Sequence, residues 1–165
     1  MRIASLTLLF LFMLGSVHSQ ISINSSDNIP AVGDSFEYQT VSSPPNMTDL
    51  IQKNGSNKTW DMSSFSGSPV DYDIIAPSSG QKTSDYPNSD MVEYVANNDA
   101  ETYYISTSSE WTQEGSYIPA AVQVIYNDPR QLLSLPMSFN DVMNDNFSGT
   151  VENIAAGQTY YRYGS

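Results

Sequence analysis

From residue 20 onward, no stretch of ten or more residues keeps the i, i+3, i+4, i+7 apolar spacing of an amphipathic helix. Short runs that alternate apolar and polar residues recur instead, which is the two-residue period of a strand with one buried face. Proline, glycine, asparagine and aspartate residues punctuate the chain between these runs, as they do in turns. The pattern predicts an all-β, antiparallel, β-sandwich-like domain. The expected strands occupy residues 34–41, 70–76, 91–96, 102–107 and 120–126.

The segment "ETYYISTSSEWTQEGSY", residues 101–117, predicts a β-hairpin with its turn near residues 108–109. Trp111 then falls on the returning strand. Adjacent Tyr103 and Tyr104 must point to opposite faces of the first strand, because side chains alternate along a strand.

Four aromatic residues of this hairpin are candidate ligand contacts. An exposed row of tyrosine and tryptophan rings provides a platform for sugar rings, as in carbohydrate-binding modules. The same residue types also suit the core and rim of a β-sandwich, where the ring is buried and its polar group reaches a partner. Both interpretations are open for Tyr103, Tyr104, Trp111 and Tyr117.

The first 19 residues have the pattern of a cleaved secretory signal peptide. Arg2 supplies a positive start, and residues 6–14 form an apolar core that is shorter than the ~20 residues needed to span a bilayer. Val17 and Ser19 are the small residues expected before a cleavage site. We therefore expect residues 1–19 to be a signal peptide and residues 20–165 to form one β-sandwich-like domain, secreted or on the cell surface.

The formal net charge of the chain is −12, with 18 acidic and 6 basic residues, and loss of Arg2 makes it one unit more negative. A chain of this charge repels phosphate backbones and anionic lipid headgroups. We therefore expect no nucleic-acid partner, and no membrane insertion after the signal peptide is removed.

Cysteine is absent, and the single histidine, His18, lies within the expected signal peptide. These absences exclude disulfide bonds, Ser-His-Asp and Cys-His catalysis, and histidine-ligated zinc from the processed chain. Carboxylate-pair hydrolysis and oxygen-ligated calcium remain available. Because no acid pair stands out among 18 acidic residues, we expect a non-enzymatic protein with no catalytic residue, no cofactor and no metal site.

Several segments resemble the N-terminal regions of secreted Bacteroidota proteins that are exported by the type IX secretion route. In that family a Gly-Asp pair precedes an alternating aromatic strand, a Thr-Trp-Asp-x-Ser segment follows, and an "LP" stretch comes later. The matching segments here are "IPAVGDSFEYQTV", "GSNKTWDMSSFSG", "YNDPRQLLSLPMSFNDVMNDNFSG" and "GQTYYRYGS".

The resemblance implies a secreted, mostly β protein whose partners are the secretion machinery and glycans or other cell-surface components. Family members usually continue with further strands and a C-terminal sorting domain, so we expect the domain to be incomplete at its C-terminus. Trp60, in the Thr-Trp-Asp segment, is expected to be a buried core residue.

Three functions follow as hypotheses. The first is a secreted or cell-surface, non-enzymatic module with an accessory, adhesive or structural role. The second is a carbohydrate-binding module that uses exposed aromatic residues, with or without calcium. The third is a fragment of a carboxylate-pair hydrolase.

Overall fold

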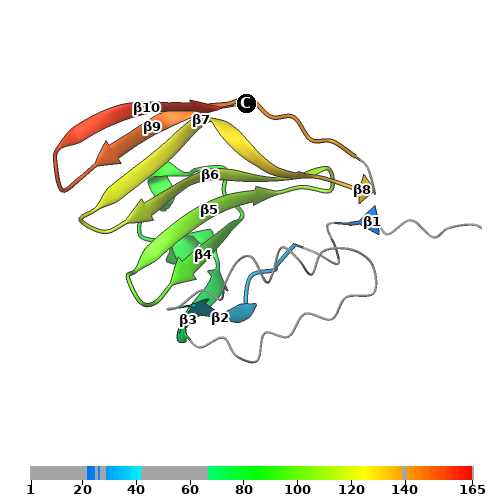
Figure 1. Cartoon of the computed structure of the whole chain (residues 1–165), viewed down its shortest axis with the longest axis horizontal. Coiled ribbons are helices and arrows are strands. Elements are labelled where there is room, and N and C mark those ends of the chain that lie inside the picture. Colours follow the sequence, from blue (N-terminus) through cyan, green and yellow to red (C-terminus); the bar gives the residue numbers. More distant parts are fainter. Residues whose placement is uncertain (1–21, 25, 27–28, 42–66, 139–140, 165) are drawn as a thin grey trace, which may run out of the picture.

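The computed structural model describes residues 22–24, 26, 29–41, 67–138 and 141–164. Within this part of the chain, eight antiparallel strands form one sheet with the order β10-β9-β7-β6-β5-β4-β3-β2, and β1 pairs with β8 in a second, two-stranded sheet (Figure 1). The prediction of an all-β, antiparallel domain is confirmed. The strands are β1 (Ser22–Ile23), β2 (Ser35–Val41), β3 (Gly67–Ile75), β4 (Met91–Val95), β5 (Ala100–Ser106), β6 (Glu110–Ile118), β7 (Val122–Ser134), β8 (Met137–Ser138), β9 (Phe147–Asn153) and β10 (Gln158–Gly164), and two short 3₁₀ helices, η1 (Pro77–Ser79) and η2 (Thr83–Asp85), connect β3 to β4.

The alternating runs of the sequence became strands β2, β3, β4, β5 and the first half of β7, as predicted. The hairpin of residues 101–117 is formed by β5 and β6, with Trp111 on the returning strand opposite Ser106. The strand β9 was not predicted, because its first residues belong to the segment "NDNFSG", residues 144–149, whose asparagine, aspartate and glycine are typical of a turn.

Strand β7 continues through Pro129, which the sequence pattern indicates as a turn. The pairing of β7 with β6 passes from Ile125 directly to Arg130, and its pairing with β9 ends at Asp128. Pro129 therefore lies at an irregular point where neither neighbouring strand pairs with it, and this is where a sheet tolerates the missing N–H of proline.

Both faces of the large sheet are buried in its centre. One face carries the cluster of Ile74, Met91 and Tyr104, and the other carries Tyr86, Val92 and Tyr103. Three strands therefore contribute adjacent residues to opposite faces, at positions 74–75, 91–92 and 103–104. Packing on both sides of the sheet accounts for the sandwich-like character.

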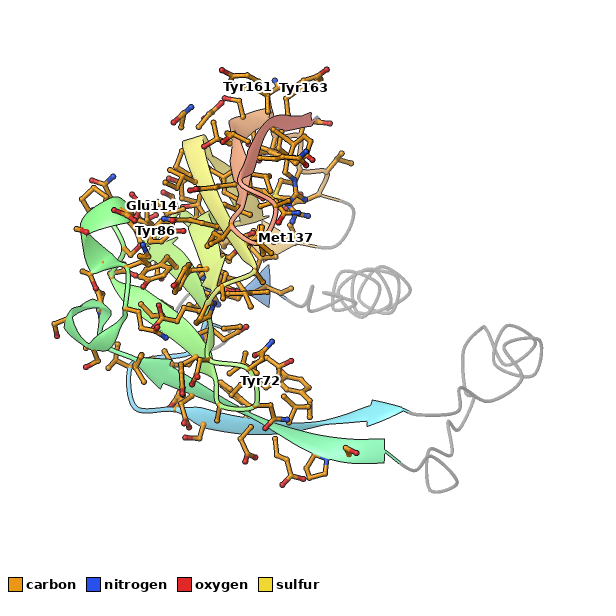
Figure 2. The ribbon with its side chains drawn as sticks, turned by 90° about the vertical axis from the view of Figure 1, so that its left-hand side faces the viewer. Tyr72, Tyr86, Glu114, Met137, Tyr161 and Tyr163 are labelled. Atoms are coloured by element: carbon orange, nitrogen blue, oxygen red, sulfur yellow. The ribbon has the colours of Figure 1, made fainter. Side chains whose placement is uncertain are left out.

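The sheet is strongly curved. Figure 2 shows β2 and β3 at one end and β9 and β10 at the other, with Tyr72 inside the curve. Tyr86 and Glu114 lie on the convex side. Tyr86 belongs to the connection of residues 76–90, which contains η1 and η2 and covers this face, and Glu114 belongs to β6. Register shifts at residues 103–104, 111–115 and 126–128 locally increase strand twist and contribute to this curvature.

Some expectations fall on residues outside the described part of the chain. These are the signal peptide of residues 1–19 and the burial of Trp60. Among the residues that are described, no helix has the length and apolar character needed to cross a membrane.

Candidate binding surface at the β10 edge

A buried carboxylate on the convex face holds the 76–90 connection against the sheet. Glu101 is 2% exposed, and its two oxygens accept hydrogen bonds from the backbone N–H of Gln81 at 2.9 and 3.0 Å. The hydroxyl of Tyr103 donates to Glu101 Oε2 at 2.6 Å and accepts from the N–H of Lys82 at 2.8 Å. Both side-chain oxygens of Glu101 thus accept hydrogen bonds from donors of the chain itself.

A second buried carboxylate, Glu114, binds the other end of this connection. Its oxygens accept from Asn88 Nδ2 at 2.9 Å and from the Ser89 hydroxyl at 2.6 Å. Gln123, also buried, donates from Nε2 to Asp85 at 2.8 Å. Buried carboxylates satisfied in this way stabilise a loop and are not available to a substrate.

Two tyrosines complete the convex core. The rings of Tyr86 and Tyr103 stack with centroids 4.0 Å apart, and the Tyr86 hydroxyl donates to the carbonyls of Ser116 and Val124 at 2.8 and 2.9 Å. Burial raises the pKa of both hydroxyls above the usual value for tyrosine, so both remain protonated donors.

The four aromatic residues predicted as ligand contacts do not form one row. Tyr103 is fully buried and shares the convex face with half-buried Tyr117, whose ring centroid is 5.1 Å from Lys82 Nζ. Tyr104 is buried on the opposite face, with its ring centroid 5.0 Å from that of half-buried Trp111. This arrangement favours the core-and-rim interpretation over a sugar platform.

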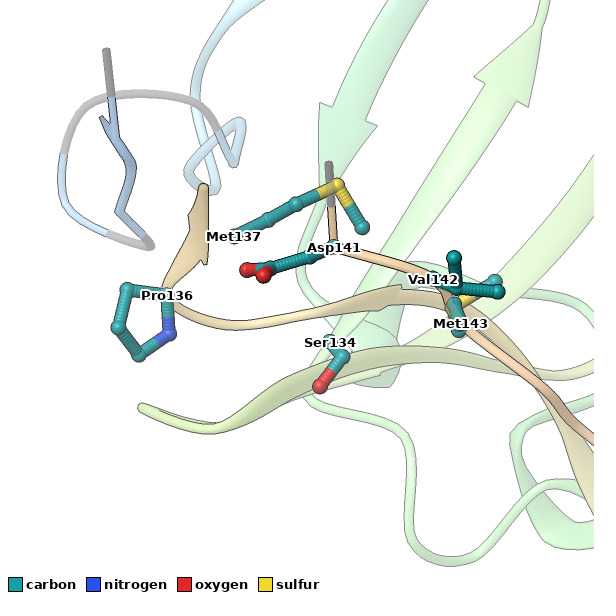
Figure 3. Close-up of a pocket in the computed structure, with 6 residues that line it drawn as sticks. All are labelled: Ser134, Pro136, Met137, Asp141, Val142 and Met143. Atoms are coloured by element: carbon teal, nitrogen blue, oxygen red, sulfur yellow. The ribbon is translucent and has the colours of Figure 1, made fainter. Parts of the chain in front are cut away.

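A shallow pocket lies where the chain turns between β7, β8 and the segment before β9 (Figure 3). Its volume is about 180 Å³, and Asp141 is its acidic group. The carboxylate of Asp141 accepts a hydrogen bond from the backbone N–H of Ser138 at 2.6 Å, so it already has a donor from the chain itself. The pocket is lined by Ser134, Pro136, Met137, Asp141, Val142 and Met143.

Three carboxylates, those of Glu110, Asp128 and Asp145, line another pocket of about 260 Å³. Gln131 donates its backbone N–H to Asp145 at 2.7 Å and its side-chain amide to Glu110 at 3.3 Å. Across the residues that the structure describes, no three or more histidine, cysteine, aspartate or glutamate residues are placed to hold a metal ion. This holds also for Asp71 and Asp73, two carboxylates that share one face of β3.

Among the described residues, the most exposed aromatic rings lie at the edge strand β10. Tyr161 is 85% exposed and Tyr163 is 82% exposed, and the two rings share a face because they are two residues apart. This is the convex face, because Tyr161 pairs with Thr150 and Thr150 pairs with Ile125, which packs against the convex core cluster. Their cross-strand neighbours on β9 are Thr150 and Ser148, which are too small to cover them. Figure 2 shows the two labelled rings projecting from this end of the molecule.

The other side of β10 is anchored to the sheet. The guanidinium carbon of Arg162 lies 5.8 Å from the ring centroids of both Tyr126 and Phe147, and Arg130 lies 5.7 Å from that of Phe147. Gly164 packs against the Phe147 ring with no room for a side chain. These contacts hold the strand in place from one face and leave Tyr161 and Tyr163 uncovered on the other.

Comparison of the chain with protein-family models, with curated proteins and with solved structures found no match. The candidate surface is therefore defined by the geometry of this chain alone. The sequence contains one signal for it, since the alternation in "QTYYRYG" places Tyr161 and Tyr163 on one face. The sequence does not indicate that this face lacks a covering layer.

Glu93, on the concave face, makes stability depend on pH. Burial raises the pKa of its carboxyl, and interaction with Tyr104 partly offsets the rise. The folded protein then holds this proton more tightly than the unfolded chain, so ionisation costs stability as pH rises above about 4.3. Relative to the unsubstituted protein, Glu93→Gln should therefore be more favourable at pH 7 than at pH 3.5, as measured by urea unfolding. Equal differences at the two pH values would contradict this prediction.

Proposed function

We propose that this chain is a secreted or cell-surface, non-enzymatic module with an accessory or adhesive role, and that its contact surface is the convex side of β10. The observation that carries the proposal is the pair of exposed rings, Tyr161 and Tyr163, on a strand that is fixed from its other face. Exposed aromatic rings on a rigid element are typical of binding surfaces, since their burial against a ligand releases much apolar area at little entropic cost.

The buried carboxylates support a role without catalysis. A general acid or base must reach a substrate proton, whereas Glu101 and Glu114 are buried and bonded to the 76–90 connection. Of the three carboxylates that line the pocket beside Gln131, those of Glu110 and Asp145 accept hydrogen bonds from Gln131. The fragment of a carboxylate-pair hydrolase is therefore the least supported of the three hypotheses.

A glycan is the ligand class that this surface suits best. Two tyrosine rings spaced by two strand residues, about 7 Å, can each stack on a sugar ring. The hydroxyls of Ser148 and Thr150 lie beside them and can hydrogen-bond sugar hydroxyls. We therefore propose the carbohydrate-binding site at β10 and not at the β5–β6 hairpin, where Tyr103 and Tyr104 are buried.

The test is binding of the purified protein to insoluble cellulose, chitin and xylan and to whole cells of the source organism. We expect sedimentation with at least one of these surfaces. Tyr161→Ser combined with Tyr163→Ser should weaken that binding by about tenfold or more, because each stacked ring is worth about 0.5–1.5 kcal/mol beyond its buried area.

The matched control is Tyr38→Ser, which removes an exposed tyrosine from β2 at the opposite edge of the sheet. It should bind as the unsubstituted protein does. Retention by cells but by none of the polysaccharides would reject the glycan and keep the adhesive role. Unchanged binding of the double variant would reject the surface itself.

A further inference from the structure

Strand β10 lies at one edge of the eight-stranded sheet. Within the described residues it pairs with β9 along all seven positions and has no partner on its other side. The pairing has no register shift, and "QTYYRYG" contains no proline, lysine or acidic residue. Natural proteins usually protect an edge with one of these devices, since the unpaired N–H and C=O groups otherwise attract another strand.

Charge distinguishes this edge from the opposite one. Strand β2 carries Glu37, and its neighbour β3 carries Asp71 and Asp73 on the same face, so that edge repels another acidic chain. The β9–β10 hairpin, residues 147–164, contains one acid, Glu152, and one base, Arg162. It is therefore neutral within a chain of net charge −12 and can approach a second copy with less repulsion than the β2 edge.

We propose that two copies of this chain associate through β10, which pairs antiparallel with the β10 strand of the second copy about a two-fold axis at Tyr161. A two-fold axis perpendicular to the sheet keeps each face continuous only if even positions meet even positions and odd positions meet odd ones. Centring on Tyr161 pairs all seven residues. Centring on Arg162 would instead oppose that positive charge to itself.

This register makes specific cross-strand pairs. Tyr161 lies opposite Tyr161 of the second copy, and Thr159 lies opposite Tyr163 of the second copy. On the other face, Arg162 lies opposite Tyr160 of the second copy, which gives two symmetric cation–π contacts. Aromatic pairs and cation–aromatic pairs of this kind stabilise antiparallel strands.

The pairing leaves the convex face of β10 open and goes beyond the proposed ligand-binding role. The four rings of Tyr161 and Tyr163 from the two copies would form one continuous stripe across the joined sheet. A dimer would therefore present a doubled contact surface, and a surface-attached ligand would bind it with avidity.

The first test is cross-linking by an introduced cysteine, which has no background because the chain contains no cysteine. Tyr161→Cys places a cysteine directly opposite the same cysteine of the second copy. Their Cα atoms would lie about 4.5–5.5 Å apart, which is within the range of a disulfide. Tyr163→Cys is the matched control, equally exposed on the same face. Its thiols would be four residues out of register, about 14 Å apart, and cannot join.

Under mild oxidation we expect most of the Tyr161→Cys protein to run as a disulfide-linked dimer in non-reducing electrophoresis, and the Tyr163→Cys protein to remain monomeric. Equal cross-linking of the two variants, or cross-linking of neither, would overturn the proposal. So would a monomer whose β10 amides are all protected from hydrogen exchange, because another segment of the same chain would then cover the edge.

The second test measures dimer dissociation by sedimentation velocity and requires no cross-link. Tyr160→Lys opposes a lysine to Arg162 of the second copy and should weaken the dimer about tenfold, whereas adding Arg162→Glu should restore it. Raising the salt concentration should strengthen the unsubstituted dimer, because it screens the repulsion of two acidic chains. Lack of rescue by the second substitution would overturn the register. Ligand binding by a monomeric variant would leave the proposed function intact.

Discussion

Replacement of Gly115 by alanine is expected to lower the free energy of unfolding by about 3 kcal/mol or more. A Cβ atom at this position would lie well inside van der Waals contact with the carbonyl oxygen of Val124 and with Cε1 of Tyr86. Neither group can move aside. The first belongs to the paired strand β7, and the second belongs to a fully buried ring that stacks on Tyr103.

Urea unfolding monitored by tryptophan fluorescence measures this effect. The matched control is Gly157→Ala, in the turn between β9 and β10, where a Cβ atom meets open space. Because Gly157 has a φ of 62°, this control should lose only about 1 kcal/mol from backbone strain. Equal losses at the two positions would mean that Gly115 is not tightly enclosed by Tyr86 and β7.

Replacement of Glu101 by alanine should cost about 3 kcal/mol and release the 76–90 connection. The substitution leaves the N–H of Gln81 and the hydroxyl of Tyr103 without their acceptor in a buried site. A hydrogen bond to a charged group contributes about 1.5–3 kcal/mol, and unsatisfied buried donors add to the loss.

Two measurements check this prediction. Urea unfolding gives the loss of stability, and the rate of tryptic cleavage after Lys82, within the connection, should rise under native conditions. Glu152→Ala removes an exposed acid from the same convex face and should change stability by less than about 0.5 kcal/mol. If the tryptic rate does not change in Glu101→Ala, the carboxylate does not anchor the connection.

Strands β2, β3, β4, β5 and the first half of β7 were predictable because apolar and polar residues alternate along these short runs of the sequence. The same rule placed Tyr103 and Tyr104 on opposite faces, and the structure confirms it, with one residue in each core cluster. The run through Pro129 was not predictable, since it depends on an interruption in the pairing of β7 with both of its neighbours. Local residue preferences carry no information about such an interruption.

The candidate surface was harder to predict than the strands. Exposure depends on which segment covers a face, and that is a property of the tertiary structure. Glu101 has the residue type of a solvated position, yet the 76–90 connection folds over it. Tyr161 has the residue type of a core position, yet the described chain places nothing over it. Alternation in the sequence identifies the two faces of a strand but not which face has a covering layer.

Ring-labelled tyrosine NMR tests most directly whether a ligand contacts the protein at Tyr161 and Tyr163, as we propose. The chain has 11 tyrosines, whose signals can be assigned by single Tyr→Phe variants. On titration with a soluble fragment of the bound glycan, the ring signals of Tyr161 and Tyr163 should shift, while those of buried Tyr86 and Tyr103 should stay unchanged. Shifts confined to Tyr38 and Tyr72, with Tyr161 and Tyr163 unaffected, would contradict the claim.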